Sequence, residues 1–219
     1  MISDWLALLL SYLYVFAVIG LGEALRRFGS YGTEFTRKFI HIGVGMWAVG
    51  TVLLFQRWWF AIVPPLSFIV INYISYRRET FKAMELGQKG NLGTVYFPIS
   101  FAALIPLLWD SPALLVAGLM PMTWGDAFAA IIGQPYGRHR YRILGRVRSW
   151  EGSLTMFAFS LLSVFLALLF LSGFGAAQSL ALALIVALIA TVVEALSPWG
   201  IDNLTVPLVS ALVLALLAR

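Results

Sequence analysis

The segment from Asp126 to Thr155 holds more residues that could do chemistry than any other part of this sequence. It starts with an acid inside an apolar run, continues through a glycine-containing turn with five arginines, and reaches Glu151 just before the next apolar run. A buried acid can hold Mg²⁺, arginines can bind phosphates, and glycines let backbone amides approach an anion. We therefore interpret the segment as a site for the phosphates of a nucleotide at a membrane surface.

The composition places this site in a membrane protein. Of the 219 residues, 61% are hydrophobic and 11% are charged, which is outside the range of soluble domains. The absence of cysteine excludes disulfides and thiolate metal sites. The sequence therefore predicts an integral membrane protein.

Eight apolar runs are long enough to cross a bilayer. They cover residues 5–25, 39–55, 58–76, 92–109, 112–133, 153–172, 178–196 and 204–218. The second and the last are marginal in length, so a seven-span or re-entrant arrangement stays open. Because no linker, repeat or low-complexity tract divides the sequence, we predict one all-α transmembrane domain over residues 1–219.

The basic residues fall almost entirely in alternate connections between these runs. These residues are Arg26, Arg27, Arg37, Lys38, Arg77, Arg78, Lys82, Lys89, Arg138, Arg140, Arg142, Arg146 and Arg148. The positive-inside rule makes those connections cytoplasmic and both termini external. Most acids lie in the same half, so we expect an active face toward the cytoplasm, in a bacterial inner or thylakoid membrane. Four spans begin at that face, and their N-termini favour anions.

Four polar residues in or near the spans are candidates for catalysis or metal binding. Asp126 lies about 10 Å inside its span, where a carboxylate costs on the order of 3 kcal/mol unless it is paired or solvated. We interpret it as functional rather than as a structural partner of an Arg or Trp. Glu194, near the end of its span, is a second candidate. Asp202 and Asn203 could cap the last helix, or bind Mg²⁺ with their oxygen atoms.

The glycine- and arginine-containing turn could hold phosphates, or its arginines could simply keep the loop in the cytoplasm. Glu151 and the serine two residues later could likewise mark no more than a helix start. Glycines and acids flank the arginines, which favours at least one phosphate contact. The residues of this turn that we expect at the phosphates are Gly133, Gly137, Arg138, Arg148, Gly152 and Ser153.

A second cationic cluster stands where the second span begins. Arg37, Lys38 and His41 share a helix face, because residues three and four apart are neighbours on a helix. His41 could simply fill space between helices and form a hydrogen bond there. Because two cations lie next to it, contact with a phosphate is the function that we favour. Lys89 opens the fourth span in a similar way. It belongs to a connection, Arg77 to Asn91, that could be a short interfacial helix or a plain loop.

The absence of several known motifs limits the reactions that this protein could catalyse. The sequence contains no Walker A motif, no soluble protein-kinase signature and no dinucleotide-binding fingerprint. With only two histidines, a histidine-rich zinc site is excluded as a working hypothesis. Phosphoryl or nucleotidyl transfer remains, with acids placing Mg²⁺ and cations neutralising a triphosphate.

The motifs also resemble those of the polyprenol and phytol kinase family, whose cyanobacterial and plastid members are the most similar in length. The resemblance rests on residues 125–133, 136–137, 149–153 and 193–207, with Arg37, Lys38, His41 and residues 93–98 matching earlier motifs. Parts of it are shared with CDP-diacylglycerol synthase. That enzyme's acid-rich C-terminal signature is missing, and Arg148 stands where a lysine is usual.

The resemblance implies a kinase that transfers the γ-phosphate of CTP or UTP to the hydroxyl of a long isoprenoid alcohol. Asp126, Asp202 and Asn203 would then hold Mg²⁺, and Glu151 or Glu194 would orient the metal or the hydroxyl. The alcohol, the nucleotide and the bilayer are the expected partners, and no nucleic acid is expected. A cytidylyltransferase like the synthase, a transporter and a non-catalytic lipid-binding protein are the alternatives, although no repeat typical of transporters is visible.

Overall fold

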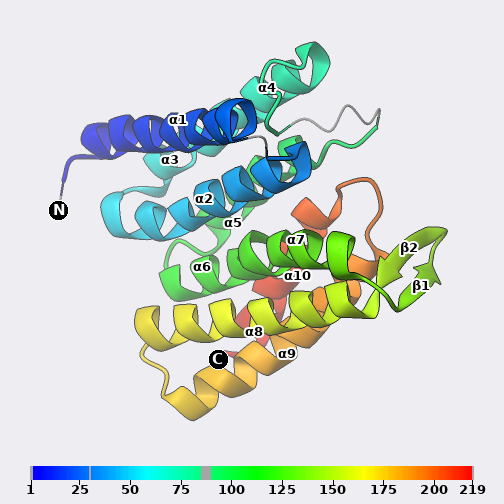
Figure 1. The fold of residues 1–219 in the computed structure, drawn as a ribbon. Coiled ribbons are helices and arrows are strands. Elements are labelled where there is room, and N and C mark those ends of the chain that lie inside the picture. Colours follow the sequence, from blue (N-terminus) through cyan, green and yellow to red (C-terminus); the bar gives the residue numbers. More distant parts are fainter. Residues whose placement is uncertain (1, 30, 85–89, 219) are drawn as a thin grey trace.

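The chain folds into a bundle of helices that lie side by side (Figure 1). The computed structural model describes residues 2–29, 31–84 and 90–218. Eight helical segments can be traced in them: α1 (Asp4–Phe28), α2 (Thr33–Leu54), α3 with α4 (Trp58–Ala61, Val63–Arg78), α5 (Gly93–Leu107), α6 with η1 and α7 (Pro112–Met120, Pro121–Asp126, Ala127–Tyr136), α8 (Trp150–Leu171), α9 (Ala176–Leu196) and α10 (Asp202–Leu217). The predicted all-α membrane bundle of eight segments is confirmed.

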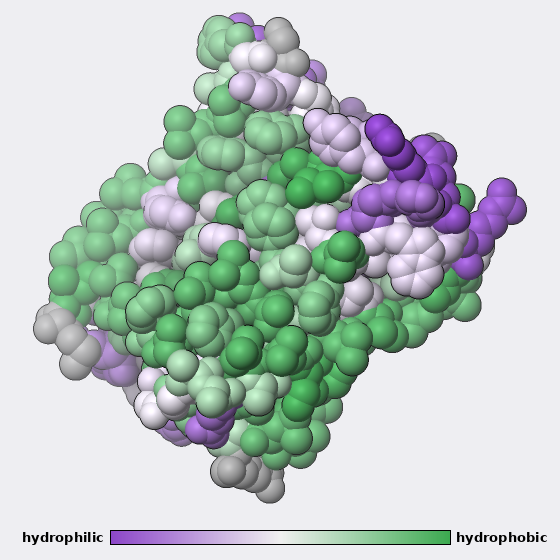
Figure 2. Space-filling model, turned by 60° about the horizontal axis from the view of Figure 1, so that its bottom comes forward, coloured by the Kyte–Doolittle hydropathy of each residue, from purple (hydrophilic) through white to green (hydrophobic). Residues whose placement is uncertain are grey.

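The outer surface of the bundle is apolar and its interior contains small and polar residues. Five segments in the described residues, α1, α3 with α4, α6 to α7, α8 and α9, are long and apolar enough to span a membrane. Figure 2 shows a broad hydrophobic surface, with the largest group of hydrophilic residues at one end. Leucines such as Leu154 and Leu188 are exposed, while serines such as Ser160 and Ser179 are buried. Small interior residues let transmembrane helices approach closely.

The second helix starts earlier than the sequence predicted. It begins at Thr33 instead of residue 39, so that Arg37 and Lys38 lie inside the helix. Hydropathy ended the predicted span at these charges, but both side chains have partners: Arg37 pairs with Glu34 one turn away, and Lys38 pairs with Asp126. Paired charges are tolerated in a helix that faces other protein.

The arginine-rich turn is a β-hairpin that the sequence analysis did not predict. Strand β1 (Arg140–Ile143) pairs antiparallel with β2 (Arg146–Ser149), and the hairpin lies at the end of the bundle between α7 and α8 (Figure 1). Both turn residues, Leu144 and Gly145, have positive φ angles of 45° and 76°. A two-residue turn with two positive φ angles matches the twist of paired strands.

Close helix contacts fix the position of the segment around Asp126. The π-helical turn η1 ends at this residue and interrupts the helical span between α6 and α7; such turns often occur at functional sites. On α7, a Cβ at Gly133 would lie 2.9 Å from the Cα of Gly152 on α8. Glycine at both positions therefore lets α7 and α8 pack backbone against backbone.

Candidate active site

Three buried carboxylates from distant parts of the sequence meet inside the bundle. Asp126 ends η1, Glu194 lies in the last turn of α9, and Asp202 begins α10. One carboxylate oxygen from each lies within 4.8 Å of the others. All three residues are at least 92% buried. We call Asp126, Glu194 and Asp202 the acid cluster.

The tight loop between α9 and α10 brings two of these acids together. Pro198, Trp199 and Gly200 reverse the chain, and the last two have positive φ angles of 55° and 81°. A Cβ at Gly200 would lie 2.7 Å from the Cα of Gly93 at the start of α5. Glycine is therefore required here by its backbone angle and by the close approach of α5.

Two cations contact the acid cluster. Lys38 of α2 forms a buried ion pair with Asp126. Arg148 of β2 donates from Nη2 to Glu194 Oε1 at 2.7 Å and to the Glu194 carbonyl oxygen at 3.2 Å. Its Nε atom is buried and has no hydrogen-bond partner among the residues that the structure describes. The site therefore has three acids, two paired cations and one donor that is free to bind an anion.

A polar cavity of about 290 Å³ opens beside the acid cluster. Asp126 and Glu194 contribute to its wall, together with residues of α7, the hairpin and the start of α8. These other lining residues are Ala129, Ala130, Gly133, Gln134, Gly137, Arg140, Val147, Arg148, Ser149, Gly152 and Ser153. We call this space the polar cavity. Its carboxylates, guanidinium groups and glycine backbone suit a phosphorylated ligand.

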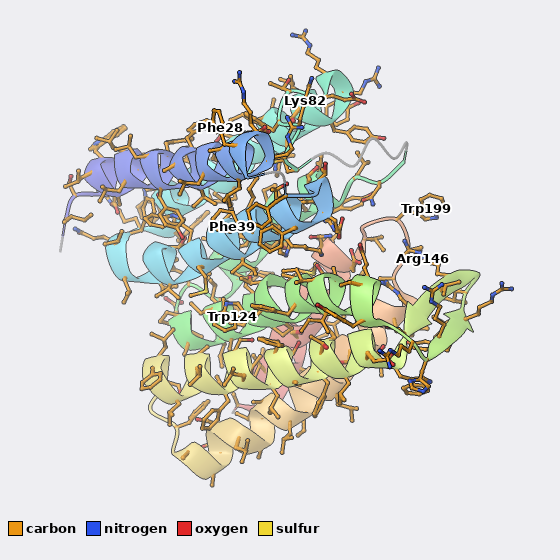
Figure 3. The ribbon with its side chains drawn as sticks, in the orientation of Figure 1. Phe28, Phe39, Lys82, Trp124, Arg146 and Trp199 are labelled. Carbon is orange, nitrogen blue, oxygen red and sulfur yellow. The ribbon has the colours of Figure 1, made fainter. Side chains whose placement is uncertain are left out.

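The hairpin positions its arginines on opposite faces. Alternate residues of a strand point to opposite sides, so Arg146 and Arg148 share one face. Arg146 donates to the Ser197 carbonyl oxygen at 2.9 Å, which fastens the hairpin to the loop after α9. Figure 3 shows Arg146 and Trp199 at the same end of the bundle. Arg140 lies on the other face and lines the polar cavity.

The donor set of the acid cluster suits a divalent cation. Mg²⁺ prefers oxygen ligands at about 2.1 Å, so two oxygens on one ion lie at most about 4.2 Å apart. Because one oxygen of each carboxylate already lies within 4.8 Å of the others, small movements of the side chains would bring the three oxygens to that spacing. Asn203 donates to Asp202 Oδ1 at 2.9 Å and to the Gly200 carbonyl oxygen at 3.1 Å. It orients the aspartate through its amide nitrogen.

The predicted phosphate-binding residues are divided between several places. Gly133, Gly137, Arg148, Gly152 and Ser153 line the polar cavity. Lys38 lies in the acid cluster, and Arg138 is exposed at the surface outside the residues that line the polar cavity. Arg37 and His41 line a different, apolar cavity, where the His41 Nε2 hydrogen bonds to the Met122 carbonyl oxygen at 2.9 Å. Lys89 lies outside the described residues, as do residues 85–88 of the predicted interfacial segment; residues 79–84 of that segment form no helix.

Glu151 is not brought to the acid cluster. Its carboxylate accepts from the backbone nitrogen and the Nδ1 of His139, at 3.1 and 2.7 Å. It thereby ties the start of the hairpin to the first turn of α8. The helix start predicted here is present, but its cap is Ser149, which accepts from the Gly152 nitrogen at 3.1 Å.

Three residues of the cavity wall were missed by the sequence analysis as phosphate contacts. They are Arg140, Gln134 and Ser149. The alternation of charge in Arg140 to Ile143 and again in Arg146 to Ser149, around Leu144-Gly145, was the available signal, because alternation on both sides of a glycine-containing turn indicates a hairpin.

The fold and the site together define a polytopic membrane protein with a buried cluster of acids and cations beside a polar cavity. The chain is 36% identical to the phytol kinase of Synechocystis sp. over 217 residues, which are 95% of this chain and 90% of that protein. It is 30% identical to "Probable phytol kinase 2, chloroplastic" of Glycine max, covering 83% of this chain and 65% of that protein. It is 24% identical to the chloroplastic farnesol kinase of Arabidopsis thaliana, over 96% of this chain and 74% of that protein.

The chain belongs to the polyprenol and phytol kinase family, as its motifs indicated. No protein-family model matches it, and no solved structure matches it significantly.

Proposed function

We propose that this protein is a membrane kinase that transfers the γ-phosphate of CTP or UTP to the hydroxyl of a long-chain isoprenoid alcohol such as phytol. The product would be the lipid monophosphate. The observation that carries the proposal is the acid cluster at the wall of a polar cavity, in a chain whose relatives are named phytol and farnesol kinases.

The polar cavity is the proposed site of the nucleotide triphosphate. Arg148 offers its unpartnered Nε, and Arg140 adds a second guanidinium group. Gly133, Gly137 and Gly152 contribute backbone to the same wall. Guanidinium groups match phosphate oxygens in geometry as well as charge, which favours a triphosphate over a neutral ligand.

Asp126, Glu194 and Asp202 are the residues that would hold Mg²⁺, with Asn203 orienting Asp202. Mg²⁺ bound there would neutralise charge that develops on the phosphates. Lys38 offsets part of the negative charge of the acid cluster and holds the Asp126 carboxylate in place. This balance keeps three acids together in a buried site when no nucleotide is bound.

In the proposed reaction, the hydroxyl oxygen of the alcohol forms a bond to the γ-phosphorus. The bond from that phosphorus to its bridging oxygen breaks, and the nucleoside diphosphate leaves. The hydroxyl proton passes to a carboxylate of the acid cluster. The acids are buried apart from the polar cavity, so a nucleotide bound in that cavity would limit the access of water, which competes with the alcohol for the phosphoryl group.

We also propose that the site faces the cytoplasm. Lys82, Arg146 and Trp199 lie at one end of the bundle (Figure 3), and the basic connections predicted to be cytoplasmic are at that end. Nucleotides are then available on the side where the polar cavity opens.

Transfer of radioactive phosphate tests the function. Purified protein is incubated with an isoprenoid alcohol, Mg²⁺ and CTP that carries the label either at the γ- or at the α-phosphate. We expect labelled lipid from γ-labelled CTP alone. Incorporation of the α-label into a lipid, with phosphatidic acid as acceptor and release of pyrophosphate, would instead show a cytidylyltransferase. Lack of either product would contradict both enzymatic functions.

A further inference from the structure

A second cavity reaches Asn203, the neighbour of Asp202, and is almost entirely apolar. It has a volume of about 90 Å³ and is lined mainly by residues of α1, α2, α4 and α5. Its aliphatic, aromatic and proline side chains include Ile19, Ile40, Val44, Phe68 and Phe101. We call it the apolar cavity. A hydrocarbon chain is the ligand that such a wall favours.

Two unpartnered polar atoms interrupt the apolar wall. The Asn72 amide nitrogen donates to the Thr94 carbonyl oxygen at 2.8 Å, which orients the amide. Within residues 2–29, 31–84 and 90–218, the Asn72 Oδ1 and the Thr94 hydroxyl are buried without a hydrogen-bond partner. Buried polar atoms are normally paired, so these two suit a ligand that brings both a donor and an acceptor. A hydrocarbon chain that ends in a hydroxyl group brings both, because a hydroxyl donates one hydrogen bond and accepts others.

The polar end of this cavity adjoins the acid cluster. Asn203 lines the cavity and bonds to its neighbour Asp202. A Cβ at Gly93, the residue before Thr94, would lie 3.0 Å from the Asn203 amide nitrogen. His41 also lines the cavity, one helical turn from Lys38 on α2. A hydroxyl group held at Thr94 therefore lies near Asn203 and Asp202, which are proposed to hold or orient Mg²⁺.

The cavity is elongated along the helices. Its wall extends along α2 from Arg37 to Trp47, which is about 15 Å at 1.5 Å per residue. Its small volume leaves no room for a whole long-chain lipid. Only the hydroxyl end of such a molecule can be enclosed, and the remainder must lie in the bilayer.

We propose that the apolar cavity binds the hydroxyl end of the acceptor alcohol, with Asn72 Oδ1 accepting from the hydroxyl and the Thr94 hydroxyl donating to its oxygen. This inference rests on the proposed kinase function and adds the location and the recognition of the acceptor. The two substrates then approach the acid cluster through two different cavities. Alcohols that share their first isoprene units have similar KM values, because the rest of the chain is outside the cavity.

Photochemical labelling tests the location without catalysis. An isoprenoid alcohol with a diazirine next to its hydroxyl end is added to nucleotide-free protein, and the labelled peptides are identified by mass spectrometry. We expect labels on α2, α4 and α5 and competition by unlabelled phytol. Val44→Phe, which fills the cavity, lowers labelling about tenfold. Val70→Phe, at an exposed position of α4, is the matched control and leaves it unchanged.

Kinetics test the recognition of the hydroxyl group. Thr94→Val raises KM for the alcohol about fivefold, the value of one neutral hydrogen bond, and leaves KM for CTP unchanged. Thr191→Val on α9, whose hydroxyl bonds within its own helix, is the control. Labels on α8 and α9, or unchanged labelling in Val44→Phe, would overturn the inference while transfer activity stands. Labelling as expected without transfer of phosphate would refute the kinase function but not the binding site.

Discussion

The two cavities beside the acid cluster are lined by opposite kinds of residue. The polar cavity, about 290 Å³, is lined by carboxylates, arginines, serines and glycines of α7, the hairpin, α8 and α9. The apolar cavity, about 90 Å³, is lined mainly by hydrocarbon side chains of α1, α2, α4 and α5. In the proposed reaction, this difference would let one site take a water-soluble substrate through the polar cavity and a lipid substrate through the apolar cavity.

The largest effect is expected in the acid cluster. Asp126→Asn removes a charge from the acid cluster and should lower kcat by at least about 10³-fold, because stabilisation of the transferring phosphate is lost. Asp110→Asn, at an exposed position between α5 and α6, is the matched control. Rates are measured with γ-labelled CTP on protein that elutes as a single species in detergent. Activity of Asp126→Asn within tenfold of the wild type would contradict the assignment.

A smaller effect, confined to the polar cavity, is expected for Arg148→Gln. The change removes the ion pair with Glu194 and the Nε donor, so kcat/KM for CTP should fall about 100-fold. Arg142→Gln is the matched control, because Arg142 is an exposed arginine of the same hairpin that does not line the polar cavity. Equal losses in both variants would indicate that the hairpin contributes general charge and not a specific contact.

The junction between the two regions is tested by a change in stability. Gly200→Ala places a Cβ at a positive φ angle and 2.7 Å from the Cα of Gly93. We expect a loss of about 1–3 kcal/mol and a fall of several degrees in Tm. Gly173→Ala, where no atom lies within 4 Å of the added Cβ, should leave Tm unchanged. A stable Gly200→Ala variant would show that α5 and the loop before α10 are not held together there.

The sequence predicted the helices well because hydropathy reports burial in lipid directly. It predicted their ends less well where charges are paired inside the bundle, as at Arg37 and Lys38. The hairpin was missed because five arginines were interpreted by their charge and not by their alternation. The strands are each only four residues long, which gives a weak periodic signal.

The sequence predicted which residues belong to the site better than it predicted how they are arranged in space. Asp126, Glu194 and Asp202 each stood out as acids at a membrane boundary, but their meeting depends on contacts between residues far apart in the sequence. The exclusion of Glu151 from the acid cluster depends on its bond to His139, which the hairpin creates. The apolar cavity was not predicted, although Arg37, His41 and Asn203 in its wall had been singled out, because its aliphatic and aromatic residues look like ordinary span residues. Cavities arise from packing in three dimensions.

The central claim is that the nucleotide and the alcohol reach one acid cluster through separate cavities, and KM values for both substrates test it most directly. They are measured for wild type, Arg148→Gln, Val44→Phe and the double variant. We predict that Arg148→Gln raises KM for CTP alone, that Val44→Phe raises KM for the alcohol alone, and that the effects add in the double variant. An increase in KM for the same substrate in both single variants would contradict the account.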